Sequence, residues 1–187
     1  MEYIPGSDLQ KLAPSLPEDQ KRKVSKRIKE VLNELRRIPS QGAFSLLLTT
    51  LDRDPSISGP FGDEEQFNQG ILKCLGRRES PHYVRLLHQA IKCTLQGHRV
   101  VFTHADLQPE NVMVEEQKGV WEDGSHDYQI TIIDWDLAGW YPEYWDYCNS
   151  TVYCQAKPEW LGLFPDIFEE YPVEYLIMRI FYMSIFY

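Results

Sequence analysis

The fold of this chain is decided by the stretch HADLQPEN at residues 104–111, together with IDWD at residues 133–136. Each stretch follows an apolar, β-branched run that is typical of a strand, so both lie where strands end. A carboxylate placed after such a run is costly unless it is paired or bound to a metal. We therefore predict one polar site at the strand ends, built from Asp106, Asn111 and Asp134.

Taken singly, these residues have simple structural explanations: Asp106 can form a turn, Asn111 can cap one, and His104 can be a buried structural histidine. Together they fit H-x-D-L-x-x-x-N, the catalytic-loop signature of kinases, followed by an aspartate where kinases keep D-F-G. Phosphoryl transfer needs a carboxylate to receive the proton of the acceptor hydroxyl and oxygen ligands to hold Mg²⁺ on the phosphates. We expect Asp106 to be the base and Asn111 and Asp134 to hold the metal. We expect His104 to fix the loop through backbone hydrogen bonds.

Two more carboxylates near these stretches each keep two interpretations. Asp136 orients a ligand or shares the metal, or else it caps the turn before Gly139. Asp146 forms a salt bridge or caps a helix. Neither is assigned a catalytic role.

The composition is that of a globular protein, with 43% hydrophobic and 13% aromatic residues. The 187 residues are enough for one well-buried domain and too few for two ordinary ones. Nineteen basic against 28 acidic residues give a net charge of −9, which argues against a nucleic-acid partner. The four cysteines show no zinc spacing, so we expect buried free thiols, with a disulfide between Cys148 and Cys154 left open.

Neither terminus predicts a membrane partner. The first residues lack the basic segment and apolar run of a secretory signal, so we expect a cytoplasmic location. The apolar stretch 175–187 is shorter than the ~20 residues that span a bilayer, and it contains Arg179. We predict a buried terminal helix there.

Cap and turn residues predict three helices before a short β region. Their limits are a capping box at 15–18 with Pro39, Asp63 with Gly76, and Ser80-Pro81 with Gly97. Residues 40–62 are predicted to be rich in loops. Strands are predicted at 100–103, 111–114 and 129–133, with a polar hairpin loop from 115 to 128 and helices from 142 onward. This order of elements indicates an α+β fold.

At these residues the chain resembles the aminoglycoside phosphotransferase and choline kinase group, and in particular its fungal members. The resemblance covers essentially the whole chain from Met1. The matching segments are SGPFG at 58–62, FTHADLQPENV at 102–112 and IIDWDLAGWYPEYW at 132–145. The resemblance implies a protein-kinase-like C-terminal lobe that is mainly helical, with a small β region carrying the catalytic loop. It also implies ATP and Mg²⁺ as cofactors.

The resemblance extends to the hinge and to the kind of acceptor. Residues 1–6 are similar to the family's hinge, where the main chains of Glu2 and Ile4 would bind the adenine of ATP. Ala105 and Gln108 replace residues that protein kinases use on phosphates, and the link from the acidic stretch to Pro142 is too short to dock a peptide. These differences favour a small-molecule acceptor.

A Gly-rich loop and a strand lysine do not precede these residues. We therefore expect one truncated domain over 1–187, with the N-terminal lobe absent and the isolated chain weakly active or inactive. Its expected parts are a hinge remnant at 1–6, a helical part at 15–97, catalytic and metal loops at 100–140, and C-terminal helices at 142–187.

Three functions remain open. The first is an ATP- and Mg²⁺-dependent transfer of phosphate to a hydroxyl of a small polar molecule. A cationic acceptor is suggested by acidic residues that face only Lys157, although such surfaces also serve solubility: Glu143, Asp146, Glu159, Asp166, Glu169, Glu170 and Glu174. The second is a catalytically impaired kinase-like protein that acts by interaction only and self-associates through exposed apolar surface. The third, metal-dependent hydrolysis, is weaker because it gives the hinge-like start no role.

Overall fold

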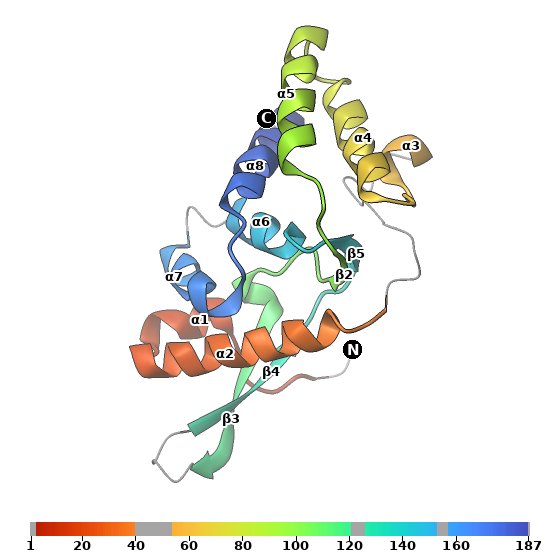
Figure 1. Cartoon of the computed structure of the whole chain (residues 1–187). Helices are drawn as coiled ribbons and strands as arrows, with labels where there is room; N and C mark the ends of the chain where they lie inside the picture. The colour runs from red at the N-terminus through yellow and green to blue at the C-terminus, as the bar shows by residue number, and fades with distance from the viewer. Residues whose placement is uncertain (1–2, 40–53, 121–125, 153–156, 187) are drawn as a thin grey trace.

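The computed structural model describes residues 3–39, 54–120, 126–152 and 157–186. The paired strands at 100–103 and 139–142 lie in the middle of the molecule, the paired strands at 112–120 and 126–132 project at the bottom, and helices form the top (Figure 1). The α+β prediction is confirmed by this arrangement.

The N-terminal helical part begins earlier than predicted, at Leu9, whereas its main helix is shorter than predicted at both ends. It contains α1 (Leu9–Leu12), a 3₁₀ turn (Ala13–Ser15) and α2 (Glu18–Leu35), which buries Val24, Ile28 and Leu32. The predicted capping box is wrong: Ser15 belongs to the 3₁₀ turn, and its hydroxyl donates to the Leu12 carbonyl at 2.8 Å. Helix α2 therefore begins after Pro17 without a side-chain cap.

Of the next three helices, the first was not predicted, and the other two begin as their cap residues predict. They are α3 (Pro55–Ser58), α4 (Glu64–Leu75) and α5 (Pro81–Thr94). Asp63 accepts from the Gln66 amide at 2.8 Å, and Ser80 accepts from the Tyr83 amide at 3.3 Å, so both caps are confirmed. The loop prediction for 40–62 is wrong at α3, and its part over 40–53 lies outside the described residues.

Two separate sheets form the β region. The first has the order β1 (Ser7–Asp8), β3 (Val112–Val120) and β4 (His126–Ile132), all antiparallel. The second pairs β2 (Val100–Thr103) with β5 (Gly139–Pro142). Strand β5 was not predicted, because its four residues begin with glycine and end with proline.

The predicted hairpin loop over 115–128 is too long, because strand pairing continues into both of its ends, and residues 121–125 lie outside the described part of the chain. Glu115 lies opposite Gln129 and Glu116 opposite Tyr128, with a register shift before Val120. The segment is polar because one face of the hairpin is solvated, while Tyr128 is 5% exposed on the face against α2.

Three helices complete the chain: α6 (Trp145–Val152), α7 (Pro158–Ile167) and α8 (Pro172–Phe186). Helix α8 buries Met178, Phe181, Tyr182 and Ile185, which confirms a buried terminal helix. Among the described helices, none is long and apolar enough to cross a membrane.

The cysteine prediction holds in part. Cys74 and Cys148 are buried free thiols, whereas Cys93 is free but exposed. Cys154 lies outside the described residues.

Two apolar cores meet at the loop that carries the first acidic stretch. One core joins α4, α5, α6 and α8 and includes Ala105. The other joins α1, α2, α7 and the β3–β4 hairpin and includes Leu107. The loop is therefore anchored on both sides of Asp106, which is itself only half-buried.

Candidate active site

Asp106 and Asn111 meet, as predicted. The side-chain Nδ2 of Asn111 donates to the backbone carbonyl of Asp106 at 2.9 Å and to the Oδ2 of Asp106 at 3.3 Å. Asn111 ends a 3₁₀ turn, Pro109–Asn111, whose backbone bond from the Asn111 amide to Gln108 closes the loop. Because the Asn111 Nδ2 donates to Asp106, the Oδ1 oxygen of the same side chain is the atom that can bind another group.

The second acidic stretch is tied to the loop through Ile133. Its amide donates to the Asn111 carbonyl at 2.9 Å, and its carbonyl accepts from His104 Nε2 at 2.9 Å. His104 Nδ1 accepts from the Asp106 amide at 3.3 Å, so the ring carries its proton on Nε2. These bonds confirm that His104 fixes the loop, and they tie Ile133, the residue before Asp134, to Asn111.

The backbone is strained at both acidic stretches. Ala105 has φ 66° and Asp134 has φ 64°, and within the described ranges no other non-glycine residue has positive φ. The left-handed region costs roughly 1–2 kcal/mol per residue. Such strain persists where surrounding contacts hold it, and it gathers at functional sites.

Helix α6 supplies contacts that hold the strained loop. Asp146 Oδ1 accepts from the Ala105 amide at 2.9 Å, Asn149 Nδ2 donates to the Ala105 carbonyl at 3.0 Å, and Ser150 Oγ donates to the Leu107 carbonyl at 2.7 Å. Spacings of three and four place these side chains on one helix face. Sequence reasoning missed this set, although its signal was present as polar residues at helical spacing between aromatic ones.

Both interpretations of Asp146 are wrong. Within the described ranges its side chain forms no salt bridge, and it lies in the first turn of α6 and not at its cap, buried at 3% exposure against the Ala105 amide. Burial raises the pKa of this carboxyl, and the hydrogen bond from Ala105 acts in the opposite direction. Asp146 is therefore a support for the loop.

The donor set at the loop suits a magnesium ion. Asp134 is exposed, and in the described part of the chain neither it nor Asp106 forms an ion pair with a basic residue. Mg²⁺ prefers hard oxygen ligands and usually takes one or two carboxylates together with substrate phosphates and water. The Asp134 carboxylate and the Asn111 Oδ1 fit that preference. The same part of the chain holds no cluster of three or more His, Cys, Asp and Glu side chains, and such a site does not require one.

Asp136 does not close the turn before Gly139. That turn is closed by the Ala138 amide, which donates to the Trp135 carbonyl at 3.0 Å, while Asp136 is exposed. A role for Asp136 in sharing the metal remains a prediction.

The hinge-like start leads into the sheet beside the loop. Glu2 lies outside the described residues, and Ile4 is half-buried. The next residues form β1, which pairs Ser7 with Val114. Gly6 has φ +100°, and a Cβ there would lie 2.3 Å from the Val114 carbonyl oxygen, so the close approach requires glycine. Nucleotide binding by Glu2 and Ile4 remains a prediction.

The predicted acidic surplus around the acceptor is wrong in its main members. Glu143 pairs with Arg99 at 2.7 Å, and Glu159 pairs with Lys21 at 3.1 Å. Glu174 contacts a histidine, and Lys157 pairs with Glu110 at 2.7 Å. These side chains are engaged within the fold because α2 supplies Lys21 and the segment before β2 supplies His98 and Arg99.

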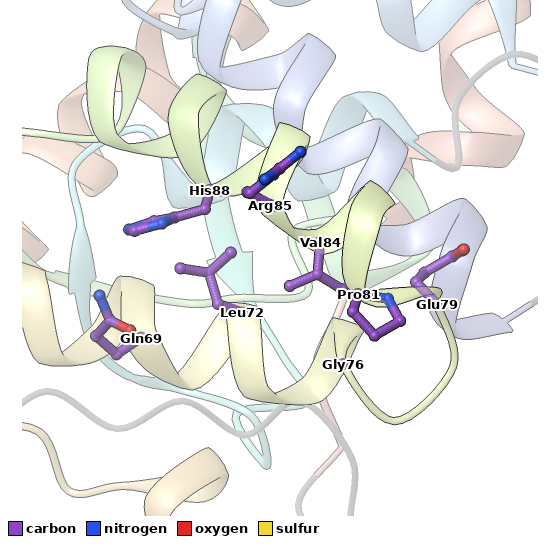
Figure 2. A pocket seen from close by; sticks show the side chains of 8 residues that line it. All are labelled: Gln69, Leu72, Gly76, Glu79, Pro81, Val84, Arg85 and His88. Carbon is purple, nitrogen blue, oxygen red and sulfur yellow. The ribbon is translucent and has the colours of Figure 1, made fainter.

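A pocket of about 470 Å³ lies between α4 and α5, as Figure 2 shows. Its lining is Gln69, Leu72, Gly76, Glu79, Pro81, Val84, Arg85 and His88. None of the candidate residues lines it, so this pocket belongs to the α4–α5 hairpin and not to the candidate site.

Comparison with known families agrees with the class of site described above. A model of the phosphotransferase enzyme family matches residues 1–172, and the chain belongs to that family. This confirms the resemblance at the level of the family, and phosphate transfer is the class of chemistry that the family implies. Among curated proteins, none matches the chain.

Proposed function

We propose that this protein transfers the terminal phosphate of ATP to a hydroxyl of a small polar molecule, with Mg²⁺. The observation that carries the proposal is the pair of hydrogen bonds through Ile133, which join the Asp106–Asn111 loop to Asp134. Membership of a phosphotransferase family supports the same chemistry. The helices around a small β region agree with the protein-kinase-like arrangement that we include in the proposal.

Each candidate residue has a separate role in this proposal. The Asp106 carboxylate accepts the proton of the acceptor hydroxyl, and the Asn111 amide orients that carboxylate through its bond to Oδ2. Asp134 and the Asn111 Oδ1 would hold Mg²⁺, which supplies charge stabilisation on the phosphates when bound. Ile4 and Glu2 would bind the adenine through their main chains.

A small-molecule acceptor is favoured over a peptide. Gln108 is 6% exposed and donates to the Asn149 carbonyl at 3.4 Å, so it supports the loop from inside and does not reach phosphate. Because Glu143, Glu159 and Glu174 are engaged within the fold, a cationic acceptor now rests on the net charge of −9 and on the remaining exposed acids of that set, Asp166, Glu169 and Glu170. The experiment must therefore compare cationic and neutral acceptors.

The test is transfer of labelled phosphate from ATP to a panel of amino sugars, amino alcohols and neutral sugars, in Mg²⁺ or in excess chelator. Mg²⁺-dependent labelling of an acceptor is the expected result. Phosphate release that is unchanged when the acceptor is omitted would instead indicate metal-dependent hydrolysis. If calorimetry detects no binding of Mg-ATP and no acceptor is labelled, the proposal is wrong and the interaction-only alternative takes its place.

A further inference from the structure

Helix α8 contributes none of the candidate residues, yet it reaches the loop through a buried chain of hydrogen bonds. The Tyr182 hydroxyl donates to Asn149 Oδ1, and Asn149 Nδ2 donates to the Ala105 carbonyl at 3.0 Å. All three residues are 8% exposed or less. The chain of contacts therefore runs from α8 through α6 to the residue just before Asp106.

The position of these contacts on Ala105 gives them a particular effect. Asp146 holds the Ala105 amide, which belongs to the peptide plane before this residue. Asn149 holds its carbonyl, which belongs to the plane after it and leads directly into Asp106. The φ and ψ angles of a residue are set by its two flanking peptide planes, so two side chains together hold the left-handed turn at φ 66°.

The Ala105 carbonyl can only accept, so it selects the Nδ2 end of the Asn149 amide, and the Tyr182 hydroxyl supplies a donor to the Oδ1 at the other end. A hydroxyl can donate to Oδ1, and this orientation leaves Nδ2 to face the Ala105 carbonyl. If the amide turned over, two oxygens would face each other at Ala105, and a buried carbonyl would lose its donor. Tyr182 thus supports this orientation, because without its hydroxyl the buried Oδ1 of Asn149 would lose its donor.

We propose that Asn149 and Tyr182 are positioning residues for phosphate transfer, which hold the strained turn that orients Asp106. The catalytic part of this inference rests on the proposed function, whereas the structural part can be measured without it. Neither residue touches the reacting atoms. Both act through the backbone of Ala105.

Two substitutions remove the relay with little loss of volume: Asn149→Ala and Tyr182→Phe. A misplacement of about 1 Å can lower a rate about 100-fold, so we expect kcat per folded molecule to fall about 10- to 100-fold. KM for ATP should stay within about twofold, because Asp106 acts on the acceptor and not on the nucleotide.

The decisive arm is rescue by Ala105→Gly. Glycine adopts positive φ without strain, so the turn should depend less on Asn149 when glycine replaces Ala105. Adding Asn149→Ala to Ala105→Gly should therefore lower kcat by much less than adding it to the wild type. Equal losses in the two backgrounds would overturn the proposal.

The chain offers a matched control for each substitution. The Tyr144 hydroxyl is buried and has no hydrogen-bond partner among the described residues, so Tyr144→Phe makes the same chemical change outside the relay. Asn68 donates to the Leu95 carbonyl and is 4% exposed, so Asn68→Ala removes a similar buried hydrogen bond that is not part of the relay. Both controls should leave kcat per folded molecule unchanged, even where Asn68→Ala lowers stability.

Hydrogen exchange separates this proposal from the proposed function. Mass spectrometry should find faster amide exchange over residues 104–108 in Asn149→Ala and Tyr182→Phe, and wild-type exchange there in both controls. If the wild type transfers no phosphate but exchange responds in this way, the proposed function fails and the relay stands. Unchanged exchange in both relay variants would overturn the relay, whatever the activity.

Discussion

Two polar clusters of this protein use similar residues in opposite ways. At the junction of α4, β2 and α8, His98 lies between two carboxylates, with Nδ1 2.7 Å from Glu64 and Nε2 3.3 Å from Glu174. Glu64 also accepts from the amides of Gly97 and His98 at 2.6 and 3.2 Å. At the candidate site, Asp106 is half-buried and Asp134 is exposed, and in the described residues neither has a basic partner.

The two clusters differ in whether their carboxylates have a basic partner within the described protein. The junction joins three elements, and its side chains are at most 16% exposed, so its groups satisfy one another. The site instead combines carboxylates that lack a cation with strained backbone at Ala105 and Asp134. Under the proposed function, bound Mg²⁺ would supply the positive charge that these carboxylates lack. Substitutions in the two clusters should therefore have different effects, activity in one and stability in the other.

The largest effect is expected for Asp106→Asn. A positioned general base contributes about 10²- to 10⁴-fold to a rate, so kcat should fall by about that factor while thermal stability stays near the wild-type value. Glu110→Gln is the matched control, because Glu110 lies in the same loop but pairs with Lys157. Steady-state transfer assays would contradict this account if the two variants lost activity equally.

Asp134→Asn should come next. Asparagine tolerates the left-handed region, so the fold should be kept while a charged oxygen ligand is lost. Loss of one group that stabilises charge lowers a rate by about 10²-fold, and more Mg²⁺ should be needed for half-maximal rate. A Mg²⁺ titration that matches the wild type would show that Asp134 does not hold the metal.

At the junction, Glu64→Ala should change stability and leave catalysis intact. The substitution removes the acceptor for the Gly97 and His98 amides, which are exposed and part-buried, and the net loss of a hydrogen bond costs about 0.5–1.5 kcal/mol. Urea unfolding should show that loss, with kcat per folded molecule unchanged. A large fall in kcat for a Glu64→Ala sample that is fully folded would contradict the distinction between a stabilising cluster and a catalytic one.

The smallest effect is expected at a surface pair, which lies outside both clusters. Arg27 bonds both oxygens of Asp127, at 3.0 and 2.6 Å, and this lowers the pKa of the Asp127 carboxyl below its ordinary value of 3.8. Since both side chains are about one third exposed, Asp127→Asn should cost about 0.5–1 kcal/mol at pH 7. The stabilisation is present above the unfolded pKa and is lost as the pH falls through the lowered folded pKa. Wild type and variant should therefore converge below pH 3.8 in acid unfolding.

The sequence predicted the parts of the site that depend on local chain order. The spacing from Asp106 to Asn111 is short enough for one loop, and the strand before Asp134 marked its place beside that loop. The caps at Asp63 and Ser80 were also local signals, and both are confirmed.

The parts that could not be predicted depend on long-range contacts. Asp146 and Asn149 meet Ala105 across about 40 residues of chain, and no local pattern gives their direction. The basic partners of Glu143 and Glu159 also come from segments far away in the sequence. The local sequence around these two acids therefore could not show that they are paired. At Ser15 the predicted cap does not form, because the same hydroxyl donates to Leu12 within a 3₁₀ turn.

The central claim is that Asp106 and Asp134 act in one site, and a double variant tests it most directly. Residues that act as a unit have effects that do not multiply. Phosphate transfer should be measured for Asp106→Asn, Asp134→Asn and the two combined, on the same acceptor and with folding checked by circular dichroism. We predict that the double variant is about as slow as the slower single variant. A rate that falls by the product of the two single losses, or a wild-type rate in Asp106→Asn, would contradict the account.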